Sequence, residues 1–254
     1  MNQLNIDDVR FYVNDNIDEF HSHRIKLISS LKLSKLISKN PYLFKAKNFM
    51  KASELVDDMM CAFLSSSEEQ LFGQFLEGLA IFIAKNTTGG EKSSSEGIDL
   101  EFSENGVRYV VSIKSGPNWG NAAQHKKQGQ DFQKAINTIK QSKQSMNVDA
   151  VLGICYGKTR TVRVKTWGYL KIVGQNFWTF ISHNEDLFTQ IIDPLGYKAK
   201  EHNDNYLIER SKISNVLVNE FTNTYCDRYG NINWTKLITA NSGNLDIVEF
   251  FREK

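Results

Sequence analysis

Cysteine and proline are scarce in this sequence, and its charges nearly cancel. Three cysteines and three prolines stand among 254 residues, and the formal net charge is +2. Cys61, Cys155 and Cys226 share no metal-ligand spacing, and an odd, scattered set gives no disulfide framework, which indicates a reducing compartment. A net charge so close to zero identifies neither a nucleic acid nor a membrane surface as the partner.

The sequence also lacks the signals of several common protein classes. No apolar run reaches the length of a membrane span, and the N-terminal MNQLNIDDVR has neither the basic start nor the apolar run of a secretory signal peptide. The five histidines form no zinc-binding pattern, and neither a P-loop nor a dinucleotide fingerprint occurs. We therefore expect a cytoplasmic protein without membrane association.

The order of the expected elements is typical of a mixed α/β domain, a central sheet flanked by helices on both faces. The expected helices cover residues 7–37, about 52–64, 66–84, 121–142, 177–181 and 211–225. The expected strands form a hairpin within residues 98–114 and two runs at 151–156 and 168–173. We expect an N-terminal helical region over residues 1–64 and a domain containing the sheet over residues 65–254.

The most informative stretch is GIDLEFSENGVRYVVSIKSGPNWGN, residues 97–121. Its NG pair at 105–106 separates two alternating runs and predicts a tight two-residue hairpin turn. This turn fixes the register, so that Leu100 faces Val111 and Asp99 faces Ser112. One side of the hairpin should carry Ile98, Leu100, Phe102, Tyr109, Val111 and Ile113. The other side should carry Asp99, Glu101, Ser112 and Lys114.

Asp99 and Lys114 are diagonal neighbours on this second side, close enough for their ends to share one ligand or water. Val110 lies on the same side, and a strand that is apolar on both faces is usually covered on both. An aspartate and a lysine in such a place need partners or a ligand. The alternative is a solvated hairpin face, the usual setting of Asp/Lys pairs on strands.

The helix 67–84 is the candidate to cover this side of the hairpin. Gly73, Glu77, Ala80 and Ala84 follow one another at spacings of four, three and four residues. Small residues around a single carboxylate describe a helix face that approaches its neighbour closely and delivers one acid. The alternative is that Glu77 is an ordinary, partly exposed glutamate.

If Glu77 joins Asp99, the site holds two carboxylates, a lysine and the backbone carbonyl of Ile113. Hard oxygen ligands of this kind suit Mg²⁺, which keeps several waters and completes its shell with substrate phosphate. The chemistry expected is metal-assisted hydrolysis of a phosphodiester. Lys114 would orient or deprotonate the attacking water.

Asp99 followed by Ser112-Ile113-Lys114 resembles the PD-(D/E)xK nuclease core, with an Asp on one hairpin strand and (D/E)-x-Lys on the next. The sequence departs from that pattern in lacking the proline before Asp99 and in placing Ser112 where the second acid stands. Some restriction enzymes of this superfamily have serine there and take the acid from a helix. The resemblance implies Glu77 in that role, with Asp131 as the alternative and Ser112 as a hydrogen-bond donor.

From about residue 40 to 240 the chain also resembles Type II restriction endonucleases of the EcoO type. The matching pieces are Asn40-Pro41, FGQFLE (72–77), GIDLEF (97–102), SIKSG (112–116), VLGICYGK (151–158), NFWTFI (176–181) and YGNINWTKL (229–237). The resemblance implies a Mg²⁺-dependent homodimer that cuts palindromic double-stranded DNA and is paired with a cognate DNA methyltransferase. The N-terminal helices and residues 211–254 are the candidates for the dimer contact, and the N-terminal helical region is also a candidate for clasping DNA.

Candidate DNA contacts follow Lys114 directly. They are Asn118, Trp119, Asn121, Gln124, Lys126 and Lys127 in the loop and the start of the next helix, and Lys158, Arg160 and Arg163 in the basic segment KTRTVRVK. The alternatives are a structural loop with Trp119 in the core, a solvated helix face, and a solvated loop or edge strand.

Three other functions remain open from the sequence. A structure-selective repair or recombination nuclease of the same superfamily would cut without a defined sequence. A catalytically inactive DNA-binding protein of this fold would have lost its site at Ser112. An enzyme acting on small phosphorylated substrates would show no salt-dependent affinity for DNA.

Overall fold

The computed structural model describes residues 4–142 and 146–242. They form two compact units, and each unit combines two separate stretches of the chain. One unit comprises Met1–Phe20 and Gln70–Ala199, and the other His21–Glu69 and Lys200–Lys254. This division differs from the expected one at residue 64, because the C-terminal helices belong with the early helices and not with the sheet.

A six-stranded mixed sheet forms the centre of the first unit, in the order β1-β2-β3-β4-β6-β5. Its strands are β1 (Glu91–Lys92), β2 (Leu100–Glu104), β3 (Val107–Lys114), β4 (Asn147–Ile154), β5 (Val162–Val164) and β6 (Tyr169–Val173). The three central strands β3, β4 and β6 are parallel, and the remaining strands run antiparallel to their neighbours. The α/β class is therefore confirmed, with β1 and β5 as two short edge strands that the sequence did not predict.

The hairpin has the predicted register. Leu100 pairs with Val111 and Glu104 with Val107, across a turn at Asn105-Gly106 where both residues have positive φ. Asparagine and glycine tolerate this left-handed conformation, which is why an NG pair closes the turn. Ile98 is an exception to the predicted alternation: it packs with Val110 rather than with Leu100, because β2 begins only at Leu100.

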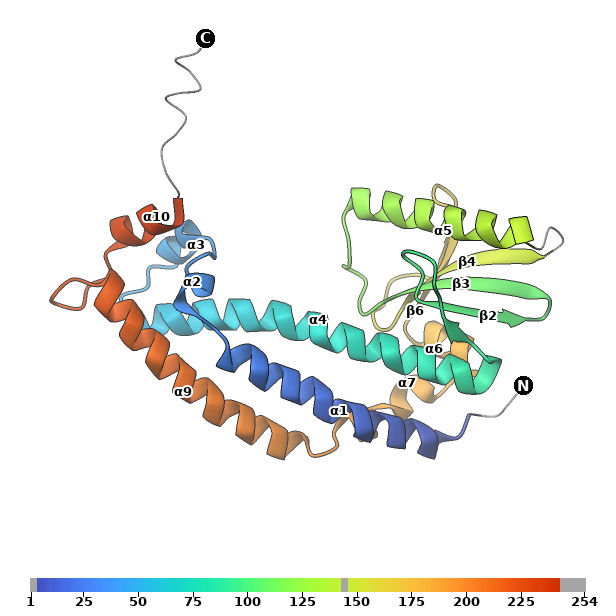
Figure 1. The fold of residues 1–254 in the computed structure, drawn as a ribbon, viewed down its shortest axis with the longest axis horizontal. Helices are drawn as coiled ribbons and strands as arrows, with labels where there is room; N and C mark the ends of the chain where they lie inside the picture. Colours follow the sequence, from blue (N-terminus) through green and yellow to red (C-terminus); the bar gives the residue numbers. More distant parts are fainter. Residues whose placement is uncertain (1–3, 143–145, 243–254) are drawn as a thin grey trace, which may run out of the picture. The chain divides into compact units, whose positions relative to one another are not determined.

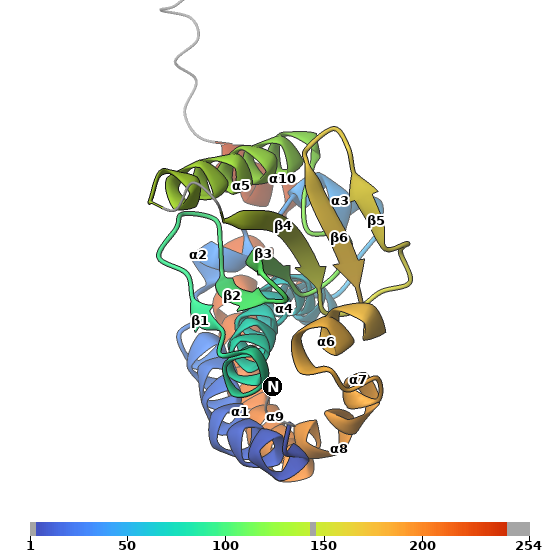
Figure 2. The same ribbon diagram turned by 90° about the vertical axis from the view of Figure 1, so that its right-hand side faces the viewer.

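Different helices cover the two faces of the sheet (Figure 2). On one face lies α5 (Ala122–Ser142), whose Phe132 and Ala135 pack with Val110 and Leu152. On the other lie α4 (Ala52–Thr88) and α6 (Gln175–Ser182). Their apolar side chains form one core with Val111 of β3. The expectation that the helix 67–84 covers the Asp99/Lys114 side is therefore wrong: α5 covers that side, because its own apolar face packs there.

Residues 52–88 form one helix, α4, where the sequence predicted two with a new start at Ser66. The hydroxyl groups of Ser66 and Ser67 donate to the carbonyl oxygens of Ala62 and Phe63, four residues earlier. Serine side chains that bond back in this way stay inside a helix, so Ser66 does not act as a cap.

The second unit is helical and has its own core. Its elements, drawn in Figure 1, are part of α1 (Ile6–Ser29), α2 (Leu33–Leu36), α3 (Pro41–Ala46), the first half of α4, α9 (Ala199–Tyr225) and α10 (Trp234–Ser242). Leu36 and Met59 from the early helices are buried together with Leu217, Phe221 and Leu237. The short helices α7 (Leu187–Gln190) and α8 (Ile192–Leu195) belong to the first unit. Among the described residues no helix has the length and apolar character needed to cross a membrane.

We expect Gly153→Ala to destabilise the protein by about 1–3 kcal/mol, the usual cost of overpacking a core. A methyl group at Gly153 would lie 2.2 Å from Cε2 of the buried Phe177 ring, so strand and ring would have to separate. The measurement is the free energy of unfolding from urea titration. Gly73→Ala is the matched control: its methyl meets Ser115 at an ordinary 3.6 Å inside a helix, and the variant should be at least as stable as the wild type.

Candidate active site

Asp99 directly precedes β2, and both its backbone and its side chain form hydrogen bonds with the backbone of β3. Its backbone N–H donates to the Val111 carbonyl oxygen at 2.9 Å. Its Oδ2 atom accepts a hydrogen bond from the backbone N–H of Ile113 at 2.6 Å, and the Nζ atom of Lys114 lies 3.9 Å from the same oxygen. The predicted meeting of Asp99 and Lys114 is therefore present, with one carboxylate oxygen at its centre.

Ser112 and Gln128 form a buried polar pair beside Asp99. The hydroxyl of Ser112, with 0% of the residue exposed, lies 3.2 Å from Asp99 Oδ2 and 3.1 Å from Gln128 Oε1. The Nε2 atom of Gln128 donates to the carbonyl oxygen of Gly97 at 3.0 Å. Gln128 was not among the site residues predicted from the sequence. Its place on the buried face of α5, four and seven residues before Phe132 and Ala135, was the available signal.

The loop before Asp99 packs tightly against α5. Gly97 has φ +73°, and a Cβ atom there would lie 2.6 Å from Asp131 Oδ2, so conformation and space both require glycine. Asp131 in turn pairs with Lys127 at 3.1 Å. Asp131, the alternative acid in the sequence analysis, therefore lies against the loop with a lysine as its partner.

Glu77 projects from α4 toward the same group of charges. Burial raises the pKa of its carboxyl group, and the negative charge of Asp99 raises it further, whereas Lys92 and Lys114 act in the opposite direction. The helix passes the end of β3 closely, since a Cβ atom at Gly73 would lie 3.6 Å from Ser115. Glu77 thus comes within electrostatic reach of Asp99 from the helix that covers the opposite face of the sheet.

Lys114 and Trp119 interact where the loop leaves β3. The ammonium nitrogen lies 5.6 Å from the centroid of the indole ring, a cation–π distance. Trp119 also packs edge-on against His125, with ring centroids 4.3 Å apart, and contacts the core under α5. The partly buried indole ring therefore borders the candidate site on one side and packs against the core on the other.

The other candidate DNA-contacting residues in this region are not all equally accessible. Asn118 and Lys126 are exposed. Asn121 caps α5 by accepting from the backbone N–H of Ala123 and Gln124, and Gln124 Oε1 accepts from the N–H of Asn121 in return at 2.9 Å. Asn121 and Gln124 thus have a structural role at the start of the helix.

The basic segment after β4 divides in a similar way. Lys158 and Arg160 are exposed in the loop before β5. Arg163 lies on β5 and forms a two-pronged ion pair with Asp149, both distances being 2.7 Å. An arginine held in this geometry has its donors directed at a carboxylate.

Asp99, Glu77 and the Ile113 carbonyl offer oxygen atoms, the kind of donor that Mg²⁺ prefers. No group of three His, Cys, Asp or Glu side chains that could hold a metal occurs among residues 4–142 and 146–242. Two carboxylates that repel one another nevertheless attract a divalent cation. The Ile113 carbonyl faces the same side of the strand as the N–H that binds Asp99. Mg²⁺ is commonly bound by one or two carboxylates, with water and substrate oxygens completing the shell.

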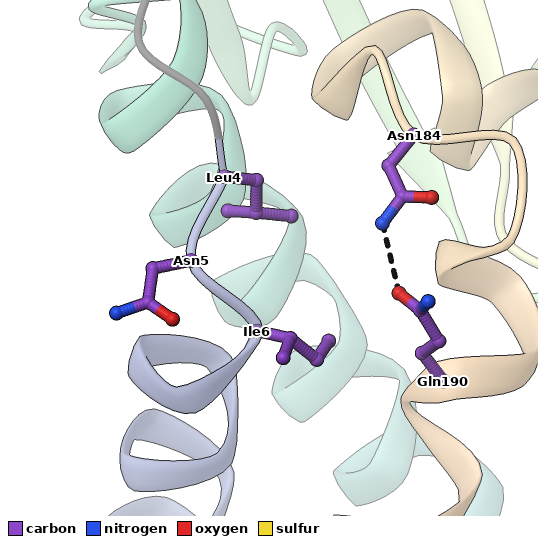
Figure 3. Close-up of a pocket in the computed structure, with 5 residues that line it drawn as sticks. All are labelled: Leu4, Asn5, Ile6, Asn184 and Gln190. Carbon is purple, nitrogen blue, oxygen red and sulfur yellow. Dashed lines mark hydrogen bonds between the residues drawn. The ribbon is translucent and has the colours of Figure 1, made fainter.

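Two of the surface pockets that the described residues form lie in this unit. One, of about 590 Å³, borders Glu77 and Lys92 and includes Tyr12 and Gln74. Lys92 Nζ lies 3.9 Å from Glu77 Oε1, so the pocket opens beside the candidate acid. The other pocket is lined by Leu4, Asn5, Ile6, Asn184 and Gln190. Figure 3 shows its Asn184 amide bonded to Gln190, and none of these five described residues has an ionisable side chain.

Comparison with known proteins identifies the family. None of the curated proteins compared with the chain matches it. A family model described as Type II restriction endonuclease EcoO109I matches residues 7–203, which include Asp99, Lys114 and every residue placed around them above. The match covers well over half of the chain and confirms the resemblance noted from the sequence. This chain belongs to the EcoO109I family of Type II restriction endonucleases.

Proposed function

We propose that this protein is a site-specific deoxyribonuclease that makes double-strand breaks in palindromic DNA by Mg²⁺-dependent phosphodiester hydrolysis. The observation that supports the proposal best is the meeting of Asp99 and Lys114 on one carboxylate oxygen, with the partly buried carboxyl group of Glu77 close enough to interact electrostatically with Asp99. This is the charge pattern that a PD-(D/E)xK site requires, and it occurs in a chain of a restriction endonuclease family.

Asp99, Glu77 and the Ile113 carbonyl are the groups that would hold Mg²⁺. When bound, the ion polarises the phosphate and lowers the pKa of a coordinated water. Lys114 has only 28% of its side chain exposed, and its ammonium group lies between Asp99 and Trp119. From there the ammonium group would orient the attacking water, or Lys114 as the neutral amine would accept a proton from that water. Ser112 would supply a hydrogen bond where other members of the superfamily have an acid.

The DNA would lie across the loop after β3 and the loop after β4. These loops carry Asn118, Trp119, Lys158 and Arg160, and the ends of parallel strands are where α/β sheets usually bind ligands. A homodimer would match a palindromic site, because its two-fold axis would coincide with that of the DNA. A cognate methyltransferase would protect the same site in the cell's own DNA, and both enzymes would work in the cytoplasm.

The first test is cleavage of unmethylated phage DNA by the purified protein with Mg²⁺ or with EDTA, followed by sequencing of the ends. We expect discrete fragments that share a palindrome, and no cleavage in EDTA. Asp99→Asn should reduce cleavage by at least about 10²-fold, because it removes the charge at the centre of the site. Asp193 is exposed on α8, and the Asp193→Asn variant should cleave DNA as the wild type does.

Each negative result has a distinct meaning. Random nicking would indicate a structure-selective nuclease, and binding without cleavage would indicate an inactive DNA-binding protein. Substantial cutting by a folded Asp99→Asn variant would exclude this site as the catalytic centre.

The raised pKa of Glu77 gives a prediction for stability against pH. The pKa of the Glu77 carboxyl group is higher in the folded than in the unfolded protein, so folding favours the protonated form. The stabilisation that Glu77 contributes is therefore fully present below its unfolded-state pKa, and it is lost as the pH rises through its folded-state pKa. In EDTA, Glu77→Gln should therefore be more stable than the wild type at neutral pH, and the difference should shrink as the solution is acidified. Urea midpoints across a pH series measure this. Glu69→Gln, exposed on the same helix, serves as control, and equal stability of Glu77→Gln and wild type at every pH would contradict the prediction.

Lys158→Ala and Arg160→Ala should weaken DNA binding in a salt-dependent way. Each phosphate contact releases condensed counterions, so each loss should reduce the slope of log K against log salt by about one. Arg163→Ala should change the slope less, because Asp149 already binds its guanidinium group. Fluorescence anisotropy with a DNA duplex in EDTA gives the slope of log K against log salt for each variant. Unchanged slopes for Lys158→Ala and Arg160→Ala would show that this loop does not contact DNA.

A further inference from the structure

The hydroxyl group of Ser112 has one hydrogen and two possible acceptors. Asp99 Oδ2 lies at 3.2 Å and Gln128 Oε1 at 3.1 Å. A hydroxyl donates only one hydrogen bond at a time, so these two acceptors compete for it. Neither Ser112 nor Gln128 is accessible to solvent beyond 6% of its surface, and bulk water therefore cannot serve as a substitute partner.

The orientation of the Gln128 amide is set by its other bond. Its Nε2 group donates to the Gly97 carbonyl oxygen at 3.0 Å. If the amide were reversed, two oxygens would face one another there. The amide oxygen of Gln128 therefore faces the hydroxyl group of Ser112. Because an amide oxygen can only accept a hydrogen bond, it always offers that hydroxyl an acceptor.

The competition matters because Asp99 Oδ2 is already heavily engaged. It accepts the N–H of Ile113 at 2.6 Å and faces the Lys114 ammonium group at 3.9 Å. A carboxylate oxygen has about two lone-pair sites. A further hydrogen bond from Ser112 would place a third donor on Oδ2 and would reduce the electron density that the Asp99 carboxylate as a whole offers to a cation.

We propose that Gln128 is a positioning residue that draws the Ser112 hydroxyl hydrogen away from Asp99 and so keeps that carboxylate available to a divalent cation. This inference rests on the proposed function, since it concerns the same site. It assigns Gln128 no contact with the metal or with DNA. Through Gly97 the same amide also holds the loop that carries Asp99.

The test compares Mg²⁺ binding in the wild type, Gln128→Met and the double variant Gln128→Met/Ser112→Ala. The readouts are the Mg²⁺-induced rise in the urea midpoint without DNA, and the Mg²⁺ concentration at half-maximal cleavage. Residues that contact metal ligands typically affect metal affinity by about 10–100-fold. We therefore expect Gln128→Met to weaken Mg²⁺ binding by that factor. We expect the double variant to recover much of the loss, because the hydrogen that would turn to Asp99 is gone.

Gln133→Leu is the matched control. Gln133 is an exposed glutamine five residues further along α5, and this variant should behave as the wild type does. Gln128→Leu replaces Gln128→Met if the latter does not fold in EDTA. Unchanged Mg²⁺ affinity in a folded Gln128 variant would overturn the inference. A double variant no better than the single would overturn it too, because it would reduce Gln128 to a structural role. A wild type that neither binds Mg²⁺ nor cuts DNA would instead refute the proposed function.

Discussion

The backbone N–H of Ile113 and the carboxylate of Asp99 are joined by a hydrogen bond of 2.6 Å, on which the arrangement of the whole site depends. Asp99 lies just outside the β2–β3 ladder, and this bond replaces the strand pairing that ends there. It fixes one carboxylate oxygen at the end of a central parallel strand. Lys114, one residue later, then reaches the same oxygen by the ordinary alternation of side chains along β3.

Two helices bring polar groups to the surroundings of Asp99 from opposite faces of the sheet. α5 supplies Gln128 within an otherwise apolar packing surface, and α4 supplies Glu77 next to a stripe of alanine and glycine. The two side chains differ in how favourable their surroundings are in the folded protein. Gln128 has both ends of its amide satisfied, whereas Glu77 is placed where burial and a like charge disfavour its ionised form. An unfavourable carboxylate is typical of a site arranged for a ligand at some expense of stability.

The sequence predicted those parts of the site that local rules determine. The NG turn fixes the register, and the register brings Asp99, Ser112 and Lys114 together. What could not be predicted depends on packing between distant segments. The spacing of Gln128, Phe132 and Ala135 places Gln128 on the apolar face of α5, but nothing local says that this face packs against Ser112. Likewise, Ser66 followed by Glu69 satisfies the capping pattern, yet the hydroxyl bonds backward because apolar residues on both sides keep α4 continuous.

The division of the chain into interleaved units has a consequence for its synthesis on the ribosome. All residues of the sheet-bearing unit, up to Ala199, emerge before α9 and α10 are translated. Domains generally fold as they emerge. The nuclease unit can therefore assemble while Leu36, Leu55 and Met59 of the other unit still await Leu217 and Phe221. During that interval the apolar side chains of α2 and α4 lack the partners that α9 and α10 supply in the folded unit.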